Sequence, residues 1–349
     1  MMPQSGVLDI DVTRARRRVA DFVELGKPRV VTMVLVTTCV GFYLGSQGMP
    51  DYLRLLPTLI GTALAAAGTL ALNQYMERDV DAKMRRTRQR PLPDGRLQPT
   101  DALVFGVVVT AVGLFYLTVA TNVLCGVVTA CISASYLLVY TPLKRRTSLC
   151  SIVGAIPGAL PPVTGWTAAR NAFGVEAWIL FAILFLWQLP HSLAIARLYR
   201  DDYAAAGIRF LPVIEPDGRS SGRQIVANCL ALVVVGLLPT LVGMTGRMYF
   251  VAALAFGIAF LAYGVAFAVA RNAPSARQLL LASLFYLPAL LIVMALDKTP
   301  AVAPFDVPSV SRLSQQPSET LAGDPDGVRA ESGSTAPVAR GPAMLVVAR

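Results

Sequence analysis

Nine long apolar segments constrain the fold of this chain more than any other feature of its sequence. Each approaches the roughly 20 residues that a helix needs to cross the hydrocarbon core of a bilayer. They lie at 29–48, 54–76, 101–120, 122–141, 150–168, 175–196, 225–245, 248–270 and 278–296. Hydrophobic residues make up 55% of the chain and charged residues only 15%, which excludes an ordinary soluble domain of this length. We therefore expect an all-α, polytopic membrane bundle of about nine transmembrane helices.

The segment at 150–168 is the most irregular of the nine. Residues that break helices interrupt it at Gly154, Pro157, Gly158, Pro161 and Pro162. Such residues are tolerated in a membrane where neighbouring helices satisfy the backbone groups that they free. We therefore count this segment as a span, but as one with a broken helix.

Basic residues are distributed unevenly among the loops, and cytoplasmic loops are enriched in lysine and arginine. One set of loops carries Arg14, Arg16, Arg17, Arg18, Lys27, Arg29, the basic residues of 83–96, Lys144, Arg145, Arg146, Arg197, Arg200, Arg209, Arg271 and Arg277. The opposite set holds little beyond Arg54, Arg170 and Arg247. We predict that the N-terminus and the charged clusters are cytoplasmic and that the C-terminus is outside. The net charge of +10 then reflects this topology and needs no nucleic-acid partner. A basic surface beside a membrane more often contacts anionic lipid or an anionic substrate.

The two ends of the chain differ in composition from its apolar middle. Residues 1–25 are polar and lack the apolar stretch of a cleavable signal peptide, so we expect a cytoplasmic N-terminal segment. Residues 299–349 are rich in proline, serine, glycine and alanine and have no helical period, which predicts a disordered tail. The transmembrane domain is expected between them, at 26–298.

A dense polar cluster follows directly on the second apolar segment. Asn73, Glu77 and Asp81 recur at a spacing of four residues, so on a helix their oxygens form one column that drifts by only about 40° per step. Carboxylate and amide oxygens suit Mg²⁺, which prefers to share its coordination shell with a substrate phosphate. This column is our candidate metal site. The residues expected to bind the phosphate are Lys83, Arg86 and Arg90.

A second polar cluster ends the sixth apolar segment, on the same predicted side of the membrane. His191 lies within the segment, and Asp201 and Asp202 follow its end. If the two helix ends face each other, their acidic residues can hold two Mg²⁺ ions with a diphosphate between them, which favours diphosphate as a leaving group. The basic loop after Tyr140, with Lys144 and Arg145, reads either as a phosphate clamp or as a plain topogenic loop.

Several separated motifs resemble the UbiA superfamily of intramembrane prenyltransferases, and within it the protoheme IX farnesyltransferase family. The column Asn73-x-x-x-Glu77-x-x-x-Asp81 is similar to the first aspartate-rich motif of the superfamily, with Glu77 where the family usually has aspartate. Five motifs point to the haem branch: Glu24-Leu25-Gly26-Lys27-Pro28-Arg29, the segment 79–93, Tyr140-Thr141-Pro142-Leu143-Lys144-Arg145-Arg146-Thr147, the segment 158–166 and the segment 202–213. Together the motifs cover about residues 20–296.

The resemblance implies a UbiA-type fold and a reaction. A Mg²⁺-dependent enzyme of the cell (inner) membrane would transfer the farnesyl group of farnesyl diphosphate to a vinyl group of haem b, giving haem O for terminal oxidases. Haem A synthase or an oxidase assembly would then be partners. Carried onto this chain, the resemblance makes Mg²⁺ ligands of Asn73, Glu77, Asp81, Asp201 and Asp202. It makes substrate-binding residues of Lys83, Arg86, Arg90, Lys144, Arg145 and Tyr140, with the basic side chains contacting diphosphate or the haem propionates.

His191 is the only histidine of the chain, and two interpretations stay open for it. It either packs between helices with a hydrogen-bond partner, or it contacts haem iron or handles a proton during transfer. For the whole protein, two alternatives also remain: a prenyltransferase acting on a quinone precursor or a chlorophyll-like ring, and a transporter. A transporter more often has polar groups halfway across the membrane, whereas strong polarity here gathers at one face.

Overall fold

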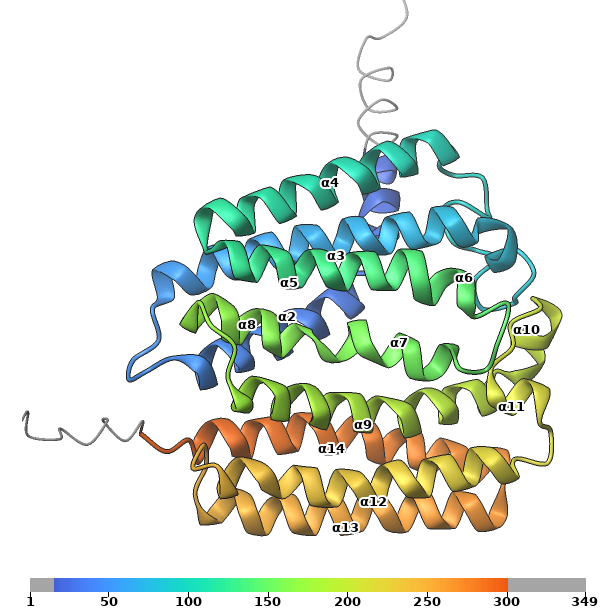
Figure 1. Cartoon of the computed structure of the whole chain (residues 1–349). Helices are drawn as coiled ribbons and strands as arrows, with labels where there is room; N and C mark the ends of the chain where they lie inside the picture. Colours follow the sequence, from blue (N-terminus) through green and yellow to red (C-terminus); the bar gives the residue numbers. More distant parts are fainter. Residues whose placement is uncertain (1–15, 301–349) are drawn as a thin grey trace, which may run out of the picture. The chain divides into compact units, whose positions relative to one another are not determined.

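The computed structural model describes residues 16–300, which are almost entirely helical (Figure 1). The predictions for 1–15 and for nearly all of the 299–349 tail lie outside the described residues. A helix over 16–25 precedes fourteen further elements. These are α2 (Pro28–Gly45), α3 (Tyr52–Asp81), α4 (Pro99–Ala120), α5 (Val123–Ala134), the π-helix η1 (Ser135–Tyr140), α6 (Thr141–Leu143), α7 (Cys150–Ala159), α8 (Pro161–Arg170), α9 (Val175–Leu198), α10 (Arg200–Ala205), α11 (Leu211–Ile214), α12 (Arg219–Leu241), α13 (Arg247–Ala270) and α14 (Ala273–Leu296).

The prediction of about nine membrane helices is confirmed. Eight helical stretches in the described part of the chain are long and apolar enough to cross a bilayer, with α5, η1 and α6 counting as one stretch. The ninth predicted span is the broken one, and it consists of α7 and α8, which are ten residues each and meet at Leu160. The break has a simple cause, because Pro161 and Pro162 carry no backbone N–H and cannot continue the hydrogen-bond ladder of α7.

Small residues allow the backbones of α2 and α8 to approach closely. A Cβ atom on Gly41 would overlap the carbonyl oxygen of Pro162, and one on Gly165 would overlap that of Thr38. Side chains are therefore excluded at both positions, and the two backbones touch. Close packing of this kind contributes to helix association in membranes. Lipid tails are as apolar as the helix surfaces, so the hydrophobic effect does not drive the helices together there.

The helix order places the polar loops together. The C-terminal ends of α3, α6 and α9 lie at the same end of the bundle, next to α10 and α11 (Figure 1). The loops after Gly45, Ala120 and Arg170 lie at the opposite end (Figure 1). The outer helices expose apolar side chains such as Phe115 and Val269, as expected of surfaces that face lipid.

Candidate active site

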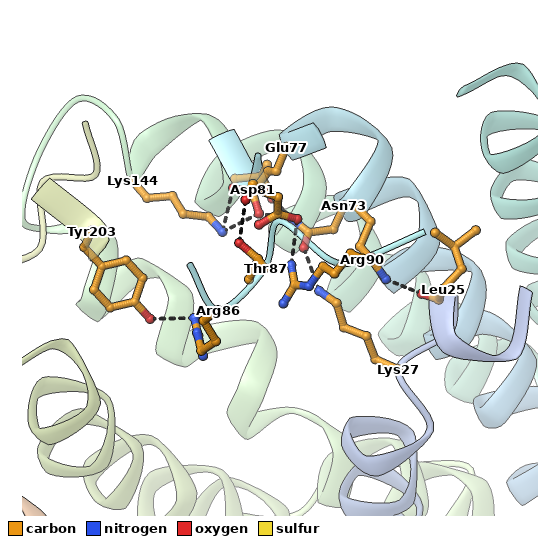
Figure 2. Close-up of polar contacts among 12 residues, drawn as sticks. Leu25, Lys27, Asn73, Glu77, Asp81, Arg86, Thr87, Arg90, Lys144 and Tyr203 are labelled. Atoms are coloured by element: carbon orange, nitrogen blue, oxygen red, sulfur yellow. Dashed lines mark hydrogen bonds and ion pairs between the residues drawn. The ribbon is translucent and has the colours of Figure 1, made fainter. Parts of the chain in front are cut away.

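The predicted column of Asn73, Glu77 and Asp81 forms the last two turns of α3 and points into the polar end of the bundle (Figure 2). Asn73 is 1% exposed and Asp81 is 2% exposed, so neither is a solvated helix end. The Asn73 amide nitrogen donates to Glu77 Oε2 at 3.0 Å, which links the first two members directly. The helical register that the sequence predicted thus gives a buried line of oxygen donors.

Each carboxylate of the column is paired with a cation from a different loop. Lys144 Nζ lies 2.7 Å from Glu77 Oε1, and Arg90 Nη1 donates to Asp81 Oδ2 at 2.6 Å. Burial by itself lowers the pKa of Lys144, but the charge and hydrogen bond of Glu77, together with Tyr136 and Asp81, outweigh it and the net shift is upward. Lys144 therefore remains charged beside the column.

The π-helix η1 and the start of α6, which follows it directly, supply the neutral partners of Asn73. The wider turn of η1 places the Thr141 hydroxyl 3.1 Å from Asn73 Nδ2, where it accepts a hydrogen bond, and the hydroxyl in turn donates to the Tyr136 carbonyl. The Tyr136 hydroxyl lies 3.5 Å from Asn73 Oδ1. Short π-helical stretches are rare in proteins, and those that occur often lie at functional sites. The irregularity by itself therefore indicates that this segment belongs to a functional site.

Lys27 reaches the column from the opposite side, and it was not among the site residues predicted from the sequence. Its ammonium donates to Asn73 Oδ1 at 3.3 Å (Figure 2). The residue has φ of 50°, a left-handed conformation that is costly for a side chain with a Cβ and tends to occur at functional sites. Burial, together with the charges of Arg90 and Lys144, lowers the pKa of Lys27 to about 7. The Lys-Pro pair at the start of the first span was the available signal.

The loop after α3 folds back over the end of α9. Thr87 donates its hydroxyl to the Asp81 carbonyl, and Arg86 donates to the Tyr203 hydroxyl at 3.1 Å. The Arg86 guanidinium also lies 4.9 Å from the ring centre of Tyr199. Arg86 therefore joins the loop after α3 to the end of α9 and to α10.

A cavity of about 420 Å³ opens beside Arg86 and extends between the helices. Its walls come from α2, α3, α5, η1 and α7 to α9, and they are mostly apolar, with hydroxyl groups spaced along them. Tyr140 and His191, both predicted as site residues, line it, and so does Gln188. The cavity reaches down to Thr62 on α3, 19 residues before Asp81, which corresponds to about 28 Å of helix.

Asp201 and Asp202 lie in different surroundings. With Lys83 they line a second pocket of about 390 Å³ at the start of α10. In residues 16–300 no three acidic, histidine or cysteine side chains converge into a metal-binding group. Convergence of both acidic clusters on one cavity stays a prediction, as do the metal roles of Asp201 and Asp202. Arg145 is exposed beside the buried Lys144.

These features have counterparts in known proteins. The model of the UbiA prenyltransferase family matches residues 34–288, so the chain belongs to this family and is a multi-pass membrane prenyltransferase. Comparison with individual relatives places the chain more narrowly within this family. Proteins named protoheme IX farnesyltransferase from Solibacter usitatus and Koribacter versatilis are 48% and 45% identical over 80% of this chain, covering 98% and 93% of their own lengths. A third, from Myxococcus xanthus, is 43% identical over 80% of the chain and 95% of its own length. Within the UbiA family, the chain groups with the protoheme IX farnesyltransferases.

Solved structures show the same fold. A digeranylgeranylglyceryl phosphate synthase matches with a TM-score of 0.69 over 80% of this chain and 98% of its own, at 16% identity. A UbiA homologue from Archaeoglobus fulgidus, bound to GPP and Mg²⁺, matches with a TM-score of 0.57 over 79% of this chain and 99% of its own, also at 16% identity. The expected UbiA-type helical bundle is thereby confirmed.

Proposed function

We propose that this enzyme transfers the farnesyl group of farnesyl diphosphate to a vinyl group of haem b, with Mg²⁺ as cofactor and haem O as product. The single observation that carries the proposal is the position of the paired acidic column. Asp81 is 2% exposed and is paired with Arg90 at the polar end of the bundle, and Arg86, in the same loop as Arg90, lines a long apolar cavity. Such a site suits both the charged diphosphate group and the apolar prenyl chain of farnesyl diphosphate.

The donor set at the column suits Mg²⁺. Glu77 and Asp81 supply two carboxylates and Asn73 supplies an amide oxygen, which matches the habit of Mg²⁺ of binding one or two carboxylates plus substrate phosphates. These three residues would hold the ion. When bound, Mg²⁺ neutralises the charge that grows on diphosphate as the allylic carbon–oxygen bond breaks.

The basic residues around the column are placed to bind the diphosphate. Lys27 and Lys144 contact the column at Asn73 and Glu77, and Arg90 contacts it at Asp81. Each of these cations now bonds to a member of the acidic column, and each can donate to a phosphate oxygen instead. Charges fixed in a buried site stabilise a leaving group without reorganising at the moment of reaction. Arg86 at the cavity border, with Lys83 and Arg145 further out, extends this surface toward haem propionates.

The cavity accounts for the two organic groups. Its apolar walls suit a prenyl chain and exclude bulk water from the reactive allylic carbon. Tyr140 lies between the cavity and the column, because its ring faces Lys144 at 4.8 Å. His191 lines the same cavity on α9, and we assign it to contact with the haem acceptor.

The relatives support the same substrates. The proteins that share 43–48% identity with this chain are named for farnesyl transfer to protoheme IX. The Archaeoglobus fulgidus homologue binds GPP and Mg²⁺. Both observations concern other proteins, and they agree with the chemistry of the site described above.

The proposal is tested by mass analysis of haem products. The purified protein, in lipid nanodiscs with haem b, farnesyl diphosphate and Mg²⁺, should yield a hydroxyethylfarnesyl haem, and a chelator should stop the reaction until Mg²⁺ is restored. Asp81→Ala should abolish the product. Asp79→Ala is the matched control, because that carboxylate is 85% exposed two residues away. Prenyl transfer to a quinone precursor but not to haem would overturn the acceptor, and full activity of Asp81→Ala would overturn the metal site.

We also propose that the protein lies in the inner membrane with its active site on the cytoplasmic side and its N-terminus in the cytoplasm. The loops at the column end carry Lys83 to Arg96 and Lys144 to Arg146, whereas the opposite loops hold few basic residues. A fluorescent-protein fusion at Gly95 should fluoresce and an alkaline phosphatase fusion at Gly48 should be active. The reverse result would contradict this orientation.

A further inference from the structure

Ser283, in the middle of α14, makes two contacts with the cavity wall on α9. Its side-chain oxygen lies 2.8 Å from His191 Nδ1, and its carbonyl oxygen accepts a hydrogen bond from the Trp187 indole at 2.9 Å. Ser283 is itself fully buried. One residue of α14 therefore holds two ring side chains of the neighbouring helix.

Counting protons assigns the tautomer of His191. The Ser283 hydroxyl has a single hydrogen, and its oxygen lies 2.6 Å from the Leu280 carbonyl oxygen, an acceptor with no hydrogen of its own. That short contact requires the serine hydrogen. The lone pairs of the serine oxygen are then left to accept from His191, so Nδ1 carries the proton and Nε2 carries a free lone pair.

The ring plane of His191 is also held. The Trp187 indole stacks on the imidazole, with ring centres 4.8 Å apart and planes inclined by 22°. A hydrogen bond at Nδ1 fixes the direction of the ring, and stacking fixes its plane, so together they set where Nε2 points. His191 and its neighbour Gln188 both line the 420 Å³ cavity.

We propose that Ser283 is a positioning residue that holds His191 in the Nδ1–H tautomer, and that His191 Nε2 thereby serves as an axial ligand for the iron of the haem substrate. This inference rests on the proposed function for the identity of the metal. Its chemistry is general: a histidine that binds a metal through one nitrogen donates the other N–H to a neighbour, which fixes the tautomer and strengthens the ligand. The step forms one Fe–N coordination bond from the Nε2 lone pair and changes no oxidation state.

The tautomer is measured without any ligand. Because His191 is the only histidine in the chain, ¹⁵N-histidine labelling of protein purified with a histidine-free tag gives signals from one imidazole. The wild type should show a protonated Nδ1 and an unprotonated Nε2, and Ser283→Ala should shift the population toward Nε2–H. Ser275→Ala is the matched control, since Ser275 on the same helix also donates its hydroxyl to the carbonyl three residues earlier. A protonated Nε2 in the wild type, or an unchanged tautomer in Ser283→Ala, would overturn the positioning role.

The metal contact is measured by titrating haem b and recording its optical spectrum. Wild type should give the spectrum of a histidine-ligated haem, His191→Ala should lose it, and Ser283→Ala should bind about 10–100-fold more weakly, the usual cost of removing such a partner. Ser283→Thr keeps the hydroxyl and should restore binding. Active enzyme whose bound haem shows no histidine ligation would overturn the axial contact and leave the proposed function intact. Absence of any farnesylated haem from the wild type would instead count against the proposed function.

Discussion

The ammonium of Lys144 lies 2.7 Å from Glu77 Oε1, and the two side chains are only 10% and 12% exposed. Lys144 follows the irregular span of α5, η1 and α6, whereas Glu77 belongs to the last turns of α3. The pair therefore links two membrane spans at the level of the column of Asn73, Glu77 and Asp81. A buried pair that loses one partner leaves an uncompensated charge, which makes this contact a sensitive test of the site.

Lys144→Met should lower both stability and activity. The substitution keeps the length of the side chain but leaves Glu77 buried without its cation, a loss of about 3–5 kcal/mol in comparable pairs. Arg146→Met is the control, because Arg146 is exposed two residues further along the same loop and has no role in the proposed site. Thermal unfolding in detergent and the rate of prenyl transfer report the two effects. Equal behaviour of the two variants would show that the Glu77 contact contributes nothing.

Thr141→Val should disturb the orientation of Asn73. Valine has the shape of threonine but cannot accept the hydrogen bond from Asn73 Nδ2 at 3.1 Å. The lost hydrogen bond is worth about 1 kcal/mol, so the KM for the diphosphate substrate should rise by about fivefold. Thr32→Val removes an exposed hydroxyl near the start of α2 and should leave KM unchanged. An equal rise in KM in both variants would show that the effect does not come from the hydrogen bond between Thr141 and Asn73.

Arg86→Lys should weaken the closure of the α3 loop over α9. Lysine keeps the charge but loses the planar group that lies 4.9 Å from the Tyr199 ring and donates to Tyr203. Loss of a cation–π contact of about 0.5–2 kcal/mol predicts a several-fold fall in kcat/KM and faster proteolysis of the loop. Arg88→Lys, at an exposed position two residues on, should change neither. Unchanged proteolysis in Arg86→Lys would refute the role of Arg86 in closing the loop.

Gly154→Ala should displace the Tyr140 ring. A Cβ atom at Gly154 would lie 2.5 Å from two carbons of that ring, too close for any rotamer to tolerate without movement. Overpacking of this kind costs about 1–3 kcal/mol, and it should also reduce prenyl transfer because Tyr140 lines the cavity. At Gly236 in α12 the nearest atom to such a Cβ is 3.6 Å away, so Gly236→Ala should be neutral or slightly stabilising. Thermal unfolding and turnover of the two variants distinguish local strain from loss of a helical glycine.

The sequence by itself determined the architecture and one half of the site. Nine apolar segments predicted the bundle because a helix must be about 20 residues long and apolar to cross lipid, and this requirement is visible in any single segment. The prolines at 161 and 162 likewise predicted the break between α7 and α8. The column of Asn73, Glu77 and Asp81 followed from helical periodicity, since all three residues share one helix.

Only the tertiary structure decided which residues from other segments meet that column. Lys144 and Arg145 look alike in sequence, yet packing of the π-helix against α3 buries the first and leaves the second exposed. Lys27 reaches Asn73 from 46 residues away, because its left-handed backbone conformation turns the chain at the start of α2. The contact between Ser283 and His191 spans 92 residues. Such pairings depend on the angles at which helices cross. Each crossing angle is set by the packing of many small and large side chains from both helices, and no local sequence pattern specifies it.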